Sequence, residues 1–86
     1  MYNLEFSTKA FSYLKSLKRK NEKIYRAIAF VLEDLKYDPG LGERLKRDLT
    51  GYLSYSTSGY RVVYKVYKQR KIILIAKIGP RPTVYN

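Results

Sequence analysis

In the first half of the chain, apolar residues first alternate with polar ones, as in a β-strand, and then recur about every 3.6 residues, as in an α-helix. Tyr2, Leu4 and Phe6 alternate with polar residues, which predicts a half-buried β-strand over residues 2–6. Two runs with a 3.6-residue period follow, and the turn residues at 37–40 end the second run. We therefore expect two helices that lie side by side as a hairpin. The apolar stripe of the first helix is Ala10, Phe11, Leu14 and Leu17, and that of the second is Ile24, Ala27, Ile28, Val31, Leu32 and Leu35.

Polar residues mark where these helices begin. Ser7 and Thr8 offer side-chain oxygens ahead of the first helix, and Asn21 does so ahead of the second. Residues 41–50 mix leucines with charged residues and show neither period clearly. For them we expect a loop with room for one helical turn.

The second half of the chain has the composition of strands. Residues 52–56, 60–67 and 71–78 are rich in Val, Ile and Tyr and are separated by turn residues, which predicts a three-stranded antiparallel meander. Residues 72–76 are apolar on both faces, so the last strand is expected inside the sheet. The expected fold is α+β: an N-terminal strand, a two-helix hairpin and the meander, forming one four-stranded sheet with the helices on one face. We expect a single domain over residues 1–86.

The middle strand of the meander has two chemically different faces. Val62 and Tyr64 lie on one face, and Arg61 and Lys65 lie on the other. The helical hairpin can cover only one of them. If it covers the face of Val62 and Tyr64, then Arg61 and Lys65 lie on the open face, together with Lys77 from the neighbouring strand.

The charge of the chain points to an anionic partner. Its 86 residues include 18 Lys and Arg against 7 Asp and Glu, a net charge of +11. Residues 1–48 hold 11 basic and all 7 acidic side chains, whereas residues 49–86 hold 7 basic side chains and no acidic one. Paired-carboxylate chemistry is therefore excluded from the C-terminal part. Nucleic acid, an anionic membrane surface and an acidic protein are the candidate partners.

The residues that are missing exclude further functions. The chain has no Cys and no His, which removes disulfides, thiolate chemistry and the usual zinc sites. We expect no metal site and no cofactor. No targeting or membrane segment is recognisable, so we expect the cytoplasm as the location.

Arg61, Arg81 and Tyr85 could together handle a phosphate. A guanidinium offers a planar fork of donors and keeps its charge when partly desolvated, and a tyrosine can stack on an exposed base. The alternative interpretation is an ordinary solvated strand residue and an ordinary C-terminal tail.

Three short motifs add a family resemblance. The string SGYRVVYKV at residues 58–66, followed by IGPR at 78–81 and VY at 84–85, resembles the RelE/ParE superfamily of bacterial and archaeal toxins. The resemblance covers essentially the whole chain. It implies the toxin of a type II toxin–antitoxin system, which a cognate antitoxin neutralises. The RelE branch cleaves messenger RNA in the ribosomal A site, and the ParE branch poisons DNA gyrase.

The resemblance also implies roles for single residues. Arg61 matches the arginine that holds the scissile phosphate, Arg81 the arginine that acts on the leaving group, and Tyr85 the tyrosine that stacks on the cleaved nucleotide. RelE has two lysines in the strand before the Gly-Tyr-Arg element, and this chain has Tyr52 and Ser54 there. We take Tyr52 and Ser54 as RNA-binding candidates.

The RelE-type reaction determines what the remaining residues must do. The ribose 2′-hydroxyl attacks the adjacent phosphodiester without a metal or a covalent enzyme intermediate. The protein has to remove one proton, stabilise a phosphorane-like dianion and assist the departing 5′-oxygen. Lys65, Lys77 and Tyr85 are the candidates for proton removal, and Lys65 and Lys77 are also RNA-binding candidates.

The function expected from the resemblance is a ribosome-dependent endoribonuclease. A ParE-like poison of DNA gyrase and a non-catalytic nucleic-acid-binding domain remain alternatives. The expected partners are mRNA, the ribosome and a cognate antitoxin, whose acidic helical segment covers Arg61 and Arg81 or displaces an element that supports them. Operator DNA is expected as a partner of the toxin–antitoxin complex only, and no membrane partner is expected.

Overall fold

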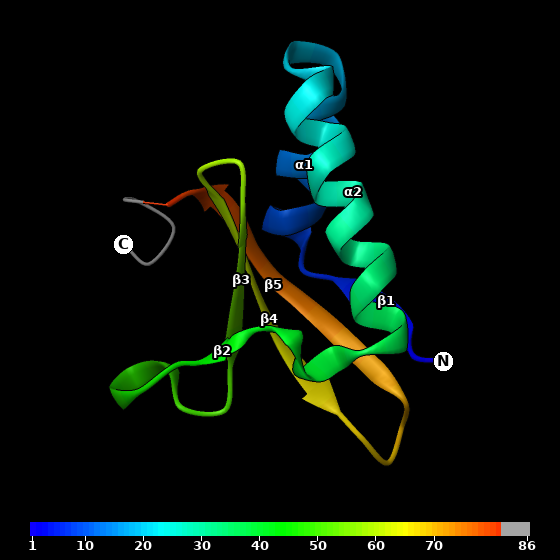
Figure 1. Cartoon of the computed structure of the whole chain (residues 1–86), viewed down its shortest axis with the longest axis vertical. Coiled ribbons are helices and arrows are strands. Elements are labelled where there is room, and N and C mark those ends of the chain that lie inside the picture. The colour runs from blue at the N-terminus through cyan, green and yellow to red at the C-terminus, as the bar shows by residue number, and fades with distance from the viewer. Residues whose placement is uncertain (82–86) are drawn as a thin grey trace.

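The computed structural model describes residues 1–81, with two helices on one side of a β-sheet (Figure 1). The helices are α1 (Thr8–Lys20) and α2 (Glu22–Tyr37), and two short 3-10 helices, η1 (Pro39–Leu41) and η2 (Arg47–Leu49), follow them. The strands are β1 (Asn3–Phe6), β2 (Glu43–Arg44), β3 (Leu53–Thr57), β4 (Tyr60–Tyr67) and β5 (Ile72–Pro80). None of the helices within residues 1–81 is long and apolar enough to cross a membrane.

Capping residues form the hairpin of α1 and α2. The Ser7 hydroxyl accepts a hydrogen bond from the Ala10 N–H (3.1 Å) at the start of α1. Asn21 donates its backbone N–H to the Leu17 carbonyl (2.8 Å) at the end of α1, and its side chain accepts from the Ile24 N–H (3.3 Å) at the start of α2. One residue therefore ends the first helix and begins the second, which keeps the connection tight.

The sheet has five strands in the order β1-β5-β4-β3-β2. The α+β class and the position of the helices on one face are confirmed, and β5 lies inside the sheet between β1 and β4, as predicted. The expected number of four strands is wrong. β2 pairs Glu43 with Ser54 and Arg44 with Leu53, and so adds an edge strand where a loop was expected. Two residues are too few to show a strand period in the sequence.

A β-bulge at Ala76 determines which way the end of β5 faces. Val63 is paired with Lys77 and Tyr64 with Ile75, so Ala76 has no residue opposite it. Ser7 donates its hydroxyl proton to the Ala76 carbonyl (2.7 Å), which ties the start of α1 to the bulge. Because of the extra residue, Lys77 shares a face with Val63 and points away from the side of Ile75.

The core lies between the hairpin and one face of the sheet. Val62 and Tyr64 are fully buried there, which confirms that the helices cover their face of β4. The buried members of this core are Ala10, Leu17, Ile28, Val31, Leu32, Leu35, Val62, Tyr64, Ile73, Ile75 and Ile78.

Tyr64 ties the segment after α2 to the sheet. Its hydroxyl donates to the Pro39 carbonyl (2.8 Å) and accepts from the Gly42 N–H (2.9 Å). Burial raises the pKa of Tyr64, although its bond with Gly42 acts in the opposite direction. A Cβ at residue 42 would lie 2.7 Å from the Tyr64 hydroxyl, so this approach of the backbone requires glycine.

Candidate active site

The face of the sheet opposite the helices, here called the outer face, carries most of the candidate residues. Residues paired across an antiparallel ladder point to the same side, so the register of β3, β4 and β5 determines its membership. Across these three strands it comprises Ser54, Ser56, Arg61, Val63, Lys65, Tyr67, Ile72, Leu74, Lys77 and Gly79.

Arg61 is half-buried on the outer face, and Ser54 holds its side chain. The Arg61 Nη1 donates to the Ser54 hydroxyl oxygen at 3.1 Å, and Ser54 itself is only 2% exposed. The two residues lie diagonally across β3 and β4, because Ser54 is paired with Val63. A guanidinium oriented in this way can bind an anion without first losing much conformational freedom.

Arg81 lies at the same end of the sheet as Arg61. It is exposed, and its backbone N–H donates to the Gly59 carbonyl (2.9 Å) in the turn between β3 and β4. Ser58 and Gly59 both have positive φ (52° and 79°), as a two-residue hairpin turn requires. Arg61 is paired with Gly79, two residues before Arg81. Tyr85 lies outside the described residues.

Lys65 is held between two tyrosine rings. Its Nζ lies 5.6 Å from the ring centroid of Tyr52 and 5.5 Å from that of Tyr67. The Arg70 guanidinium is 6.0 Å from the Tyr67 ring. An ammonium group is attracted to the faces of aromatic rings, so both tyrosines help to fix the position of Lys65.

Val63 lies at the centre of three cationic side chains, those of Arg61, Lys65 and Lys77. It lies between Arg61 and Lys65 on the same face of β4, and Lys77 is its partner on β5. Alternate residues of a strand are about 7 Å apart, and paired residues on neighbouring strands are about 5 Å apart. The outer face therefore gathers Arg61, Lys65 and Lys77 around Val63, as expected from the sequence for helices that cover the face of Val62 and Tyr64.

Tyr67 and Arg70 were not among the residues selected from the sequence. Tyr67 could have been found, because it alternates with Lys65 along β4 and so shares its face. Arg70 lies in the turn before β5, where no period indicates the direction of a side chain.

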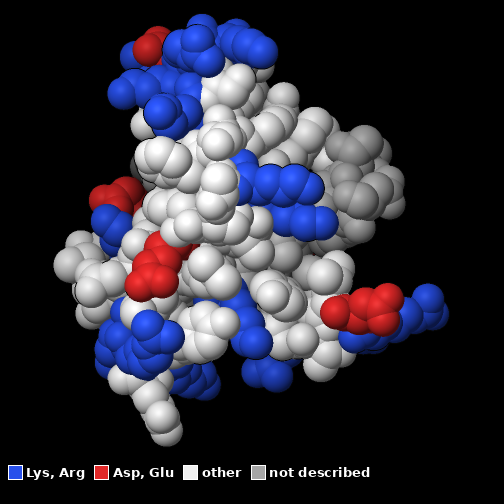
Figure 2. All heavy atoms as spheres, turned by 180° about the vertical axis from the view of Figure 1, so that it is seen from behind, with Lys and Arg blue, Asp and Glu red and all other residues white. Residues whose placement is uncertain are grey.

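Among the paired strands of residues 1–81, the carboxylates of the outer face lie at its two edges. Glu43 of β2 is opposite Ser54, and Glu5 of β1 is opposite Leu74, and both are exposed. Residues 1–81 contain no group of three or more Asp, Glu, His or Cys side chains that could hold a metal ion. Figure 2 shows a further dense group of Lys and Arg side chains at the tip of the helical hairpin, at the top of the view. The charge of +11 is therefore shared between separate surfaces.

Comparisons with known proteins identify the family. The profile of the family described as ParE toxin of the type II toxin–antitoxin system, parDE, matches residues 4–85. No curated protein sequence matches the chain. The fold is similar to that in the toxin–antitoxin complex RelBE2 from Mycobacterium tuberculosis (28% identity, TM-score 0.80), over 93% of this chain and 98% of that one.

Two further structures agree with this result. The YoeB–YefM complex from Staphylococcus aureus is similar at 31% identity and a TM-score of 0.78, over 91% of this chain and 94% of that one. The isolated RelE toxin from E. coli has the same fold at 20% identity and a TM-score of 0.78, over 93% of this chain and 84% of that one. The resemblance seen in the sequence is confirmed: the chain belongs to the ParE toxin family of type II toxin–antitoxin systems, within the RelE/ParE superfamily.

Proposed function

We propose that this toxin is a ribosome-dependent endoribonuclease that acts in the cytoplasm and cleaves mRNA in the ribosomal A site. The observation that carries the proposal is the arrangement of Arg61, Lys65 and Lys77 on the outer face, with Arg81 following at the end of β5. These side chains would surround a phosphate with positive charge, and no carboxylate of residues 49–86 competes for them.

In the proposed reaction the ribose 2′-oxygen attacks the adjacent phosphorus. The bond from phosphorus to the 5′-oxygen then breaks, which leaves a 2′,3′-cyclic phosphate and a 5′-hydroxyl. Arg61, oriented by Ser54, stabilises the dianion that forms in between. Arg81 stabilises the charge on the departing 5′-oxygen, which takes a proton from water.

The two lysines have different roles in this proposal. The Lys65 ammonium lies against the rings of Tyr52 and Tyr67, an arrangement that suits a fixed positive charge. We therefore assign phosphate binding to Lys65. The proton of the 2′-hydroxyl passes to Lys77 in its amine form.

A gyrase poison is the second candidate, because the matching profile is that of the ParE toxins. The positions of the two RelE lysines are also occupied by Tyr52 and Ser54. Under this candidate the outer face would bind its target without cleaving RNA. A non-catalytic nucleic-acid-binding domain is the third candidate.

The test is expression in a bacterium, with metabolic labelling of protein and DNA synthesis. We expect protein synthesis to stop and mRNA to be cut in the A site. Arg81→Ala should lower the cleavage rate about a hundredfold, as the loss of one transition-state donor does elsewhere. Arg26→Ala, which removes an exposed arginine on α2, is the matched control.

The same experiment separates the alternatives. A selective block of DNA synthesis, with intact mRNA, would reject the ribonuclease in favour of the gyrase poison. Normal growth together with salt-sensitive DNA binding by the purified protein would select the non-catalytic domain.

A further inference from the structure

A pocket of about 350 Å³ lies on the helix side of the sheet, and its lining extends to Tyr52, which contacts Lys65 of the outer face. Leu53 and Val66 form its apolar floor, and both share the face of Tyr64, which the hairpin covers elsewhere. Pro39 of η1 forms one wall. Both floor residues are half-buried, so the pocket is a part of the core face that α1 and α2 leave open.

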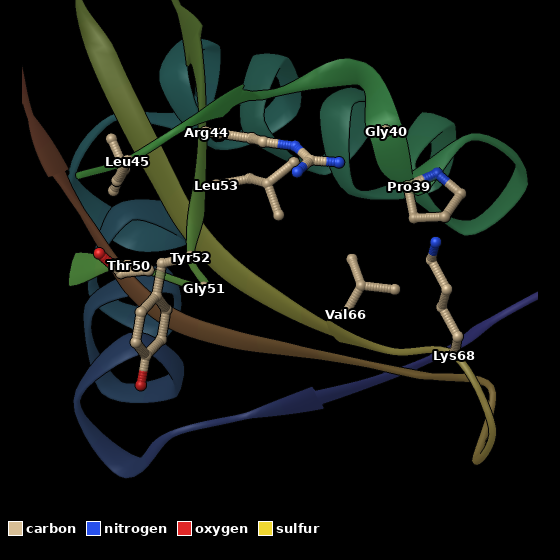
Figure 3. A pocket seen from close by; sticks show the side chains of 10 residues that line it. All are labelled: Pro39, Gly40, Arg44, Leu45, Thr50, Gly51, Tyr52, Leu53, Val66 and Lys68. Atoms are coloured by element: carbon tan, nitrogen blue, oxygen red, sulfur yellow. The ribbon is translucent and has the colours of Figure 1, made fainter.

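Two cations lie at the mouth of this pocket. Figure 3 shows the Arg44 guanidinium and the Lys68 ammonium pointing across the same space, near Leu53 and Val66. No Asp or Glu lines the pocket, and neither cation forms an ion pair within residues 1–81. Glu43, the neighbour of Arg44, lies on the opposite face of β2. The pocket thus combines an apolar floor with an unneutralised positive mouth.

The wall of the pocket is rigidly attached to the sheet. The Tyr64 hydroxyl binds both the Pro39 carbonyl (2.8 Å) and the Gly42 N–H (2.9 Å), which fixes η1 and the backbone that follows it. A ligand would therefore find the pocket already formed and would not have to order this segment.

We infer that this pocket is a docking site for the antitoxin, which inserts an apolar side chain flanked by Asp or Glu. The aliphatic floor suits a leucine-like or phenylalanine-like side chain, and the mouth complements adjacent carboxylates on a partner of opposite charge. Tyr52 adds an aromatic ring to the lining, but this ring lies against the Lys65 ammonium (5.6 Å), and the floor formed by Leu53 and Val66 offers no stacking surface for a nucleotide. The inference rests on the family membership and not on RNA cleavage. It places an antitoxin anchor on the helix side of the sheet, beside Tyr52, whose ring contacts Lys65.

Charge reversal at the mouth tests this docking site. Arg44→Glu/Lys68→Glu is compared with Lys9→Glu/Lys23→Glu, which changes the net charge equally but in the first turns of α1 and α2, where Glu is well tolerated. Both pairs are made in the Arg81→Ala background to suppress toxicity. The probe is the purified product of a reading frame adjacent to that of this chain, the position where the gene of a cognate antitoxin is expected. We expect the pocket pair to weaken binding about tenfold or more, mainly through the association rate, and the control pair to change it less than about twofold.

A second variant tests the pocket without changing charge. Gly40→Phe adds bulk at a lining position where a Cβ meets only the Asp38 Oδ1, at 3.7 Å, and it should also weaken binding. Equal affinities for the pocket and control pairs, with Gly40→Phe unchanged, would overturn the docking site. The docking site would also be overturned if the pocket variants lost only single-stranded RNA binding or self-association and still bound the probe. No binding of the probe by the parent protein would contradict the toxin–antitoxin pairing on which the inference rests.

Discussion

At the scale of single residues, Ser54 determines how Arg61 is presented to a ligand. Its hydroxyl is the acceptor for the Arg61 Nη1, and it is buried beneath the outer face. A lysine at this position could not accept such a bond, because an ammonium group is only a donor. The departure from the two RelE lysines thus has a structural consequence: the small residue on β3 orients the large cation on β4.

Ser54→Ala should therefore slow RNA cleavage. The variant removes the acceptor without adding bulk, and a hydrogen bond to a charged group contributes about 1.5–3 kcal/mol. We expect the cleavage rate to fall roughly tenfold or more, measured on mRNA in a reconstituted translation reaction. Ser56→Ala is the matched control, because Ser56 lies directly opposite Arg61 on the same face. Equal rates for the two variants would contradict the orienting role of Ser54.

At the scale of elements, a single hydroxyl joins the segment after α2 to the sheet. Tyr64→Phe removes the hydrogen-bond partner of both Pro39 and Gly42 while keeping the buried ring. We expect the free energy of unfolding to fall by about 1–3 kcal/mol, measured by urea denaturation near neutral pH. Tyr37→Phe, at a tyrosine that is 74% exposed, should leave stability unchanged.

The stabilisation by Tyr64 should also depend on pH. Burial raises the pKa of Tyr64 above the ordinary value of 10.0, so the folded state favours the neutral hydroxyl. Its contribution is complete below pH about 10 and is lost as the pH rises through the raised pKa of the folded state. The difference in unfolding free energy between the wild type and Tyr64→Phe should therefore narrow in alkaline solution. If this difference in unfolding free energy stayed constant as the pH rises, burial of the Tyr64 hydroxyl would not be what stabilises the folded state.

Most elements were predictable because their signals are local. The strand and helix periods identified the hairpin and the meander, and Ser7 and Asn21 cap the helices as their side chains suggested. β2 was missed because Glu43 and Arg44 become a strand only through their pairing with β3. The bulge was equally hidden, since residues 72–76 are all apolar and either face could have been inward. Lys77 was expected on the outer face, but the bulge that turns its side chain to that face was not predicted.

The candidate site was predictable to the extent that alternation determines a face. Arg61 and Lys65 lie together on the outer face because they are four residues apart on one strand. The bond from Arg61 to Ser54 and the contact of Lys65 with Tyr52 join different strands or loops, and no spacing along the chain reveals such partners. The pocket likewise combines residues from η1, β2, β3 and the turn after β4.

At the scale of the whole molecule, the net charge of +11 could act in two ways. It could attract any polyanion to the entire surface, or the outer face could provide a specific binding site. Two lysines distinguish these cases. Lys65 and Lys15 each place an Nζ 5.5 Å from an aromatic ring, that of Tyr67 and that of Phe11, but Lys15 lies on α1 on the opposite side of the sheet. Each substitution by alanine removes one charge together with cation–π contacts, to two rings for Lys65 and to one for Lys15.

Lys65→Ala should weaken the binding of a labelled single-stranded RNA and lower the slope of log affinity against log salt by about 0.7, the value for one phosphate contact on a single strand. Lys15→Ala should leave both quantities close to those of the wild type. Lys65→Arg should retain binding and cleavage, because it keeps a cation between the rings of Tyr52 and Tyr67. Equal losses for Lys65→Ala and Lys15→Ala would show that the net charge alone attracts RNA. Loss of cleavage in Lys65→Arg with RNA binding intact would instead make Lys65 the group that takes the proton, since a guanidinium cannot do so at neutral pH.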